Sequence, residues 1–378
     1  MLALKRQATW RGSVAIPREM VRTRIDDGFP LARIPQVGHW LTVTRKSTDP
    51  IDLMKHTAIR LWPLFWMLGT LAMAITGCGR QDASAPSGTG PREHLVIFSQ
   101  CNNAEPYRAA QNRRMEELFA KVPGVKLAIY DGQADAAKQI SQIENAIRQK
   151  PDLLIVAPLQ RDALTKVMGE AMAASIPTLC LERDIVQPNY TSWIRCDNFK
   201  IGQMAGQWIV DHLTKKHGEP RGSLVEIRGM QGVEGAINRH AGAHSVLTNH
   251  PKIKVIHDAT ANWFQPQAMD RMTEALNANP SGIDVVYAHN DPMAYGAYLA
   301  AKEKGREKEM VFVGVDGLPH EGAKYVEQGV LGVTFEYPLC VDQAVEIGTR
   351  LLQEPGFKPE KSYLMESRII ARAGGAAK

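Results

Sequence analysis

The sequence lacks the short motifs that mark the common nucleotide-binding and nucleophilic sites. It contains no GxSxG segment, no P-loop and no GxGxxG fingerprint. Its five cysteines include no CxxC pair, and no Cys and His residues stand at a zinc-site spacing. We therefore expect neither a metal nor a cofactor, and the missing motifs disfavour an enzyme.

An excess of positive charge is confined to the beginning of the chain. The formal net charge is +5, but residues 1–77 hold 11 of the 45 basic and 5 of the 40 acidic residues. The remaining 301 residues therefore carry 34 basic and 35 acidic side chains. This balance removes the argument for a nucleic-acid partner. The remaining length is sufficient for two ordinary domains with cores of their own.

One long apolar run, Leu61–Cys78, separates the basic beginning from the rest of the chain. It follows the basic segment Lys55–Arg60 and ends in the letters ITGC. This order is typical of an export signal, and the ITGC ending resembles the lipobox of bacterial lipoproteins, whose cysteine is lipidated. The alternatives are a short transmembrane anchor or a buried core helix, which Pro63 and the Gly-Cys ending disfavour. We predict a lipoprotein signal peptide at 54–77 and lipidation at Cys78.

The segment before this signal is unusual in an exported protein. Because Met54 would make an ordinary start, we interpret residues 1–53 as an extension from a start codon assigned too far upstream. The rival interpretation is a DNA-binding head, but the segment has no helix-turn-helix pattern. Beyond the signal, residues 78–91 are rich in Gly, Ser, Ala and Pro, which predicts a flexible tether.

Four further cysteines lie beyond the tether, at Cys101, Cys180, Cys196 and Cys340. In an oxidising compartment an even set could pair, although spacing does not give the connectivity. Cys180 and Cys196 end consecutive predicted strands and could be neighbours. Buried thiols that pack as small hydrophobic groups are the alternative.

From residue 93 onward, short apolar runs alternate with helical patterns. The predicted strands are 94–99, 126–130, 153–157, 178–181, 193–196, 223–227, 254–257, 285–288, 311–315 and 332–336, with a closing segment at 368–371. The predicted helices are 106–121, 134–148, 161–174, 198–216, 235–249, 267–277, 292–304, 319–328 and 341–353. Nearly continuous apolar strands such as LLIVA indicate burial on both faces. The rhythm predicts an α/β fold of two doubly wound parallel-sheet lobes, with a break near 196–199.

Polar and aromatic side chains follow these strands, where ligands bind in open α/β sheets. Carboxylates, amides and guanidinium groups can satisfy hydroxyl groups, and aromatic faces can cover the C–H faces of a ring. Together they describe a site for a small polyol such as a sugar. For individual residues, the alternatives to ligand binding are helix capping, surface ion pairs and packing in the core.

Four motifs carry a family resemblance: NNAEPYR, CDNFKIGQMAG, HNDPMAYGA and VGVDG. With them, the chain from about 94 to 370 resembles the type I periplasmic sugar-binding proteins of ABC importers, the ribose-binding group, whose fold LacI-type regulators share. The resemblance implies an N-terminal lobe of 92–197 plus 337–366 and a C-terminal lobe of 198–336 plus 367–378. It places a hinge at Asp197 and Asn198.

The resemblance also implies the ligand contacts. They are Asn103, Tyr107, Glu182, Arg183, Arg239, Trp263, Asn290, Asp316 and Glu336. Two of them depart from the family pattern: Glu182 stands where an Asp is usual, and the segment around Glu336 is one residue shorter than in ribose binders, which have Gln at that contact. The exact sugar is therefore left open.

The expected protein is an exported, lipid-anchored, monomeric receptor that binds a sugar or polyol and delivers it to a membrane permease. It would lie on the periplasmic or cell-surface face and touch the membrane through lipidated Cys78. A sensor that signals to a membrane kinase or chemoreceptor is the first alternative. A LacI-like regulator is the second, disfavoured by the lipobox.

Overall fold

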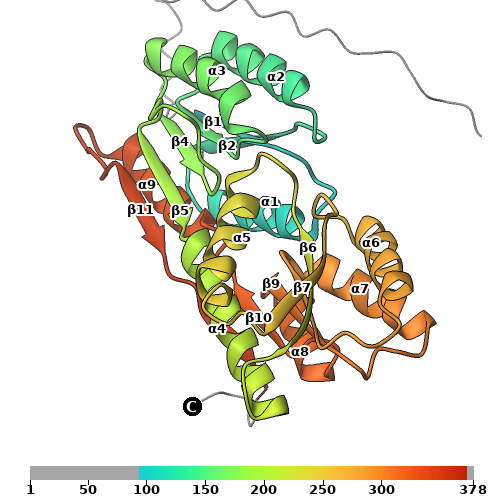
Figure 1. Cartoon of the computed structure of the whole chain (residues 1–378). Helices are drawn as coiled ribbons and strands as arrows, with labels where there is room; N and C mark the ends of the chain where they lie inside the picture. Colours follow the sequence, from blue (N-terminus) through green and yellow to red (C-terminus); the bar gives the residue numbers. More distant parts are fainter. Residues whose placement is uncertain (1–92, 373–378) are drawn as a thin grey trace, which may run out of the picture. The chain divides into compact units, whose positions relative to one another are not determined.

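The computed structural model describes residues 93–372, which fold into two α/β lobes (Figure 1). The predicted upstream extension at 1–53, the signal peptide at 54–77, Cys78 and the tether up to residue 91 lie outside the described residues. Within 93–372, no helix has both the length and the apolar character needed to cross a membrane.

The first lobe is built on a six-stranded sheet of order β11-β5-β4-β3-β1-β2, in which every pairing is parallel. Its strands are β1 (His94–Gln100), β2 (Val125–Asp131), β3 (Leu153–Val156), β4 (Thr178–Leu181), β5 (Ser192–Cys196) and β11 (Ser362–Met365). Its helices are α1 (Pro106–Phe119), α2 (Ala136–Gln149), α3 (Arg161–Ala173) and α9 (Val341–Gln353).

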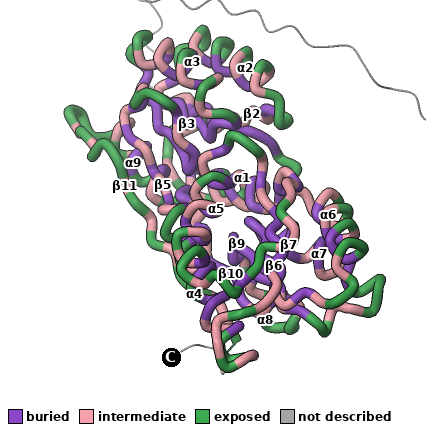
Figure 2. The backbone as a smooth tube through the Cα atoms, viewed as in Figure 1, coloured by how far each residue is buried: buried purple, intermediate pink, exposed green. Residues whose placement is uncertain are grey.

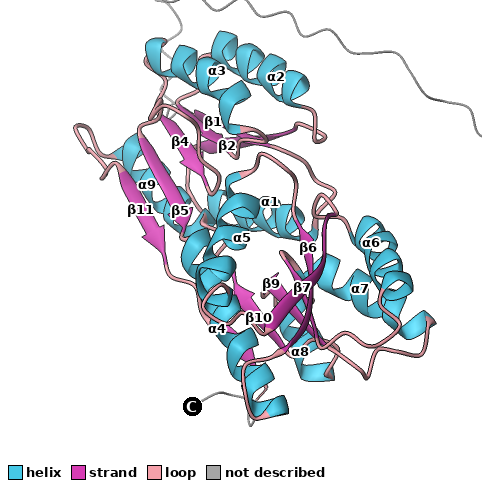
Figure 3. Ribbon diagram, in the orientation of Figure 1, coloured by secondary structure: helices cyan, strands magenta, loops and turns pink. Residues whose placement is uncertain are grey.

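The second lobe repeats this plan with the order β12-β10-β9-β8-β6-β7. Its strands are β6 (Gly222–Arg228), β7 (Ile253–Thr260), β8 (Val285–Ala288), β9 (Val311–Asp316), β10 (Val333–Glu336) and β12 (Ile369–Ala371). Its helices are α4 (Asn198–His217), α5 (Glu234–Leu247), α6 (Gln265–Ala278), α7 (Asp291–Glu303) and α8 (Gly322–Gln328). The two sheets appear as separate groups of arrows, each with helices beside it, in Figure 3.

Helices cover both faces of the first sheet because its strands are apolar on both sides. Val96 and Phe98 of β1 pack in one core cluster with residues of α1 and α9. Ile97, between them, packs in a different cluster with residues of α2 and α3. Successive strand residues point to opposite faces, so a continuous apolar run supplies both layers. Figure 2 shows the result: β3 is buried, whereas the outer turns of α2 and α3 are exposed.

The chain passes between the sheets three times. It crosses after β5, returns between β10 and α9, and crosses again between β11 and β12. The first crossing starts α4, where the Asp197 side chain accepts a hydrogen bond from the backbone N–H of Lys200 at 2.9 Å. Asp197 is therefore the N-cap of α4, which satisfies one of the free N–H groups of the first turn.

Close packing of α4 against α5 positions two polar residues of the site. A Cβ added at Gly202 would overlap the carbonyl oxygen of Arg239, and one at Gly242 would overlap that of Phe199. Only glycine permits backbones to approach this closely. The helix pair consequently holds Asn198 at the start of α4 next to Arg239 on α5.

The predicted fold class is confirmed, and three details of the prediction are corrected. β11 was not predicted, because its residues alternate between exposed and half-buried positions and form no apolar run. The predicted closing strand is β12, but it pairs antiparallel with β10. The helix expected from 319 begins at Gly322.

Of the two alternatives left open for Cys180 and Cys196, the structure shows buried free thiols and no pairing between these two cysteines. The Cys180 thiol donates to the carbonyl oxygen of Arg183 at 3.1 Å, whereas the Cys196 sulfur lies 3.6 Å from that of Cys340. All four described cysteines are free and buried. Cys340 follows the return crossing, so its approach to Cys196 depends on the tertiary arrangement and not on neighbouring strands.

Candidate functional site

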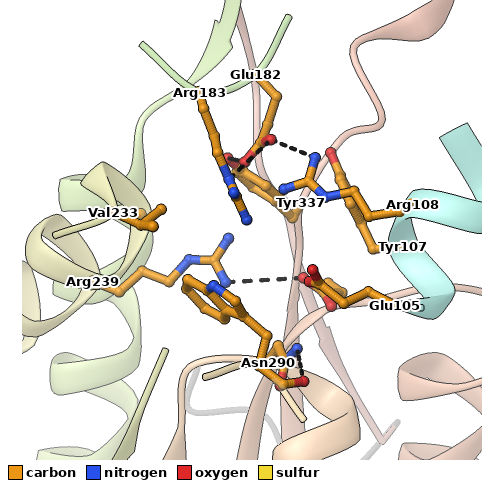
Figure 4. Close-up of a pocket in the computed structure, with 12 residues that line it drawn as sticks. Glu105, Tyr107, Arg108, Glu182, Arg183, Val233, Arg239, Asn290 and Tyr337 are labelled. Atoms are coloured by element: carbon orange, nitrogen blue, oxygen red, sulfur yellow. Dashed lines mark hydrogen bonds and ion pairs between the residues drawn. The ribbon is translucent and has the colours of Figure 1, made fainter. Parts of the chain in front are cut away.

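A pocket with an empty volume of about 310 Å³ is lined by residues of both lobes (Figure 4). The first lobe supplies Glu105, Tyr107, Arg108, Glu182 and Arg183. The second lobe supplies Val233, Gly235, Arg239, Trp263, Asn290 and Asp316, and Tyr337 lies on the return crossing after β10.

Strand ends place many of these residues. Glu182 follows β4 directly, Asn290 follows β8, and Asp316 is the last residue of β9. The carboxyl ends of parallel strands share one edge of a sheet, and ligands of open α/β sheets bind outside that edge. Because the edges of both sheets contribute to one pocket, a ligand bound there would touch both lobes.

A buried network of hydrogen bonds is centred on the Glu182 carboxylate. One oxygen accepts from the Arg108 guanidinium at 2.6 Å, and the other accepts from the Tyr337 hydroxyl at 2.7 Å. Burial would raise the pKa of Glu182, but the charges of Arg108 and Arg183 outweigh it and bring this pKa below its ordinary value. Glu182 is therefore a fixed anion that holds Arg108, rather than a group free to take up a proton.

Arg239 is the corresponding cation of the second lobe. Its Nε donates to the Asn198 side-chain oxygen at 3.0 Å, and its Nη1 donates to the carbonyl oxygen of His289. The guanidinium carbon lies 4.4 Å from the centre of the Tyr337 ring and 5.6 Å from that of Trp263. Aromatic faces and neutral acceptors thus fix the plane of the Arg239 guanidinium, and its positive charge has no short ion pair.

Asp316 is buried without the hydrogen bonds that a buried carboxylate normally needs. Its nearest cation is Nη1 of Arg239, 3.9 Å from Oδ1, and no donor within 93–372 is hydrogen-bonded to its side chain. Burial raises the pKa of Asp316 well above its ordinary value, the charge of Arg239 opposes this, and the negative charge of Asp291 adds to it. An added hydroxyl donor would satisfy a group that the protein leaves unpaired.

Three buried N–H groups in the pocket wall also have no hydrogen-bond partner in the described residues. They are Nε of Arg108, Nε of Arg183 and Nε1 of Trp263. Leaving a buried donor unpaired costs about 1–3 kcal/mol. Together with Asp316, they form a set of donors and acceptors that suits a ligand with several hydroxyl groups.

Backbone strain coincides with the site. Glu182, Trp263 and Asp316 have φ values of 65°, 75° and 126°, in a region that residues other than glycine rarely occupy. Such conformations cost about 1–3 kcal/mol each and cluster at ligand sites. All three residues line the pocket.

Seven of the predicted contact residues line this pocket. They are Tyr107, Glu182, Arg183, Arg239, Trp263, Asn290 and Asp316. Asn290 has a second task, because its side-chain oxygen accepts from the N–H of Met293 at 3.0 Å and caps α7. Of the predicted hinge pair, Asp197 caps α4, and Asn198 supports the pocket by accepting from Arg239.

Two predicted contacts, Asn103 and Glu336, lie outside the pocket lining. The Asn102 side chain accepts from the backbone N–H groups of Ala104 and Glu105, which turns Glu105 inward and leaves Asn103 exposed. Glu336 pairs with Arg368, at 2.7 Å from Oε2 to Nε. In both places a neighbouring residue occupies the pocket, Glu105 in one and Tyr337 in the other.

Five further residues of the lining are not among the predicted contacts. They are Glu105, Arg108, Val233, Gly235 and Tyr337. Arg108 and Tyr337 belong to segments already placed at strand ends, so their positions carried a signal. Val233 lies in the loop before α5 and has no chemical feature that could have marked it.

Comparisons with known proteins identify the family of this chain. Residues 96–355 match the family model described as a periplasmic binding protein domain. The chain is 30% identical over 261 residues to the xylitol-binding protein of Mycolicibacterium smegmatis, covering 69% of this chain and 71% of that protein. It is 31% identical to the galactofuranose-binding protein of Escherichia coli, covering 72% and 86% respectively.

Solved structures show the same likeness. The fructose-binding periplasmic domain of a hybrid two-component system aligns with a TM-score of 0.69 at 32% identity, covering 75% of this chain and 92% of that one. A galactofuranose-binding protein aligns with a TM-score of 0.68 at 28% identity, covering 74% and 94%. Because the family model spans both lobes and the relatives are matched over most of their length, this chain belongs to the periplasmic binding protein domain family.

Proposed function

We propose that this protein is the solute-binding component of an ABC importer, and that it binds a sugar or polyol in the pocket between its lobes. The observation that carries the proposal is the set of unsatisfied polar groups in the pocket. Asp316 lacks a donor, and Arg108, Arg183 and Trp263 each have an N–H without an acceptor among the residues described. A small polyol supplies both kinds of partner.

The charges of the pocket favour a neutral ligand. Three guanidinium groups, on Arg108, Arg183 and Arg239, share the lining with three carboxyl groups, on Glu105, Glu182 and Asp316. A sugar acid or sugar phosphate would add negative charge to a balanced site.

Aromatic rings complete the proposed contacts. The rings of Tyr107 and Tyr337 lie 5.2 Å apart in the wall, and Trp263 lies beside Arg239. We assign contacts with the C–H groups of the ligand to Tyr107 and Trp263, and hydroxyl contacts to Arg183, Arg239, Asn290 and Asp316. The names of the relatives, which bind xylitol, galactofuranose and fructose, support this ligand class.

Ligand delivery requires that the lobes open and close. We propose lobes of 92–197 with 337–366 and of 198–336 with 367–378, closing at the hinge of Asp197 and Asn198. Export and attachment through lipidated Cys78 belong to the same proposal. A receptor that delivers a solute to an importer must lie on the outer side of the membrane that holds the permease. The protein then catalyses no reaction.

A thermal-shift screen of the purified protein tests the proposed ligand class. Pentoses, hexoses and polyols form the neutral set, and sugar acids and sugar phosphates form the charged control. A ligand at about 100 times its Kd stabilises a protein by roughly 2.7 kcal/mol, which is a shift of several degrees at this size. A hit confined to the charged set, or to compounds without hydroxyl groups, would contradict the proposal.

A sensor role is a second candidate, favoured by the 32% identity to a fructose-binding domain of a hybrid two-component system. The pocket would be the same, but the closed form would bind a signalling receptor instead of a permease. Cross-linking of the ligand-bound protein in its native membrane separates the two roles by the partner that is captured.

A further inference from the structure

A second cluster of functional groups lies on α5, apart from the pocket. His240 and His244 stand one helical turn apart, and their rings are 4.1 Å from centre to centre. Nδ1 of His240 lies 2.9 Å from Oε1 of Glu226, and Nε2 of His244 lies 2.7 Å from Oε2. Glu226 is in β6 and is fully buried, whereas the histidine side chains are 31% and 28% exposed.

The spacing of these atoms matches a metal-binding group. One nitrogen from each histidine and one Glu226 oxygen all lie within 4.8 Å of one another. Two histidines at i and i+4 on one helix face with a carboxylate are a recurrent ligand set for zinc. Each histidine nitrogen now lies at hydrogen-bond distance from Glu226, so bonds of about 2.0–2.2 Å to a shared metal would require it to move away from the carboxylate.

A third histidine, His289, holds the Glu226 carboxylate in its orientation from the buried side. His289 is fully buried, with Nε2 3.0 Å from Oε1 of Glu226 and Nδ1 3.4 Å from the backbone N–H of Gly229. The N–H of Gly229 donates to Nδ1, so Nε2 carries the proton and donates to Glu226. A fixed partner of this kind is the usual outer support of a metal-ligating carboxylate.

The surrounding charge permits a cation. The nearest other ionised groups on β6 and β7 are Arg228 and Asp258, which form an ion pair at 2.6 Å and largely cancel. The Glu226 carboxylate therefore supplies the net charge of the cluster. Because both histidines are partly exposed, a metal could enter from solvent and keep a water as its fourth ligand.

We propose that Glu226, His240 and His244 form a binding site for a divalent transition metal of the zinc type. The metal takes the ring nitrogens that now face Glu226, so each ring proton moves to the other nitrogen or is released to solvent. The ligands are nitrogen and oxygen without sulfur, which suits Zn²⁺, Co²⁺, Ni²⁺ or Cu²⁺ rather than Ca²⁺ or Mg²⁺. The site differs from the cysteine-based one that the sequence was found to lack.

Such a metal would hold together elements that carry residues of the pocket, without lining the pocket itself. Arg239, next to His240 in α5, points into the pocket, and His289 precedes Asn290. The site would thus join β6, α5 and the end of β8 without touching the sugar. Metal binding is therefore expected to raise the Tm of the protein. Its effect on sugar affinity is a separate measurement.

Titration of tag-free, chelator-treated protein with Zn²⁺ tests the proposal. Calorimetry should show saturable binding of one Zn²⁺ per protein molecule and an increase in Tm. Co²⁺ should give visible d–d absorption bands of low-coordinate nitrogen and oxygen ligation. His240→Gln and His244→Gln, singly and together, should each weaken Zn²⁺ binding by at least about tenfold, since each removes one ligand.

His250→Gln is the matched control, because His250 lies on the loop after α5 and outside the cluster. Both cluster histidines are partly exposed, so their variants should fold, which circular dichroism checks. The proposal is overturned if the wild type binds no Zn²⁺, or if the double variant binds it as tightly as the His250→Gln control. Glu226, His240 and His244 would then be an ion-pair cluster alone.

Discussion

Replacing Asp316 by Asn tests two consequences of burying a carboxylate that lacks a hydrogen-bond donor: stronger ligand binding and lower stability of the ligand-free protein. The side chains have the same shape, so the backbone strain at φ 126° and the packing are retained. If the carboxylate accepts hydroxyl hydrogen bonds from the ligand, each contributes about 1.5–3 kcal/mol, against about 0.5–1.5 for a neutral acceptor. Asp316→Asn should therefore weaken sugar binding by about 1–2 kcal/mol, or roughly 5–30-fold in Kd.

Without ligand, the same variant should be at least as stable as the wild type at neutral pH. The pKa of Asp316 is raised in the folded state because burial outweighs the attraction of Arg239. A raised carboxyl pKa means that the unfolded protein loses this proton more readily. The ionised group therefore destabilises the fold above its unfolded pKa, and this cost disappears as the pH falls and the folded group is protonated.

The assay combines calorimetric titration of the identified ligand with thermal unfolding between about pH 4 and pH 8. The Tm difference between Asp316→Asn and the wild type should be greatest near pH 8 and should shrink toward pH 4. Wild-type affinity in the variant would show that Asp316 makes no ligand contact. A variant less stable than the wild type at neutral pH would refute the argument that burial of this carboxylate outweighs the attraction of Arg239.

The remaining predictions concern the opposite lobe, the first crossing and the anchor. Arg183→Ala should weaken ligand binding by about 1.5–3 kcal/mol, through the loss of charged hydrogen bonds; equal affinity in calorimetry would remove Arg183 from the site. The Tm of the ligand-free variant should also fall, because Arg183 helps to keep buried Glu182 ionised and donates to the carbonyl oxygen of Leu159. Asp197→Ala removes the cap on the N–H of Lys200 and should cost about 0.5–2 kcal/mol in urea unfolding. Its Kd for the ligand should stay unchanged if capping is the whole role, whereas an altered Kd would point to the hinge. Cys78→Ser should move the protein from the membrane to the soluble fraction on an immunoblot, and retention in the membrane would exclude a lipid anchor at this residue.

The general plan of the fold followed from the sequence because it depends on local patterns. Apolar runs such as Leu153–Val156 are long enough for a strand and too continuous for a sheet with one solvent-exposed face. The alternation of these strands with helical segments requires parallel pairing. The edge strand Ser362–Met365 escaped the same reasoning. An edge strand that is half exposed needs no apolar run, so its sequence resembles that of a loop.

The site was predicted where a strand end alone places the side chain. Asn290 lies two residues after the end of a buried strand and Asp316 ends one, so their position needs little more than the direction of the strand. Asn103 and Glu336 lie outside the lining because local contacts in their loops turn other side chains, those of Glu105 and Tyr337, toward the pocket. An Asn102 turn exposes Asn103, and the bond to Arg368 draws Glu336 toward β12.

The sequence by itself thus determined the order of the elements, the two-lobed class and most of the residues that meet in the pocket. The tertiary structure decided which distant groups became neighbours. Cys196 faces Cys340 and not Cys180, and Glu226 gathers His240, His244 and His289. The physical reason is that strand and helix periods act over a few residues, whereas these contacts arise from the packing of elements that are up to 144 residues apart in the sequence.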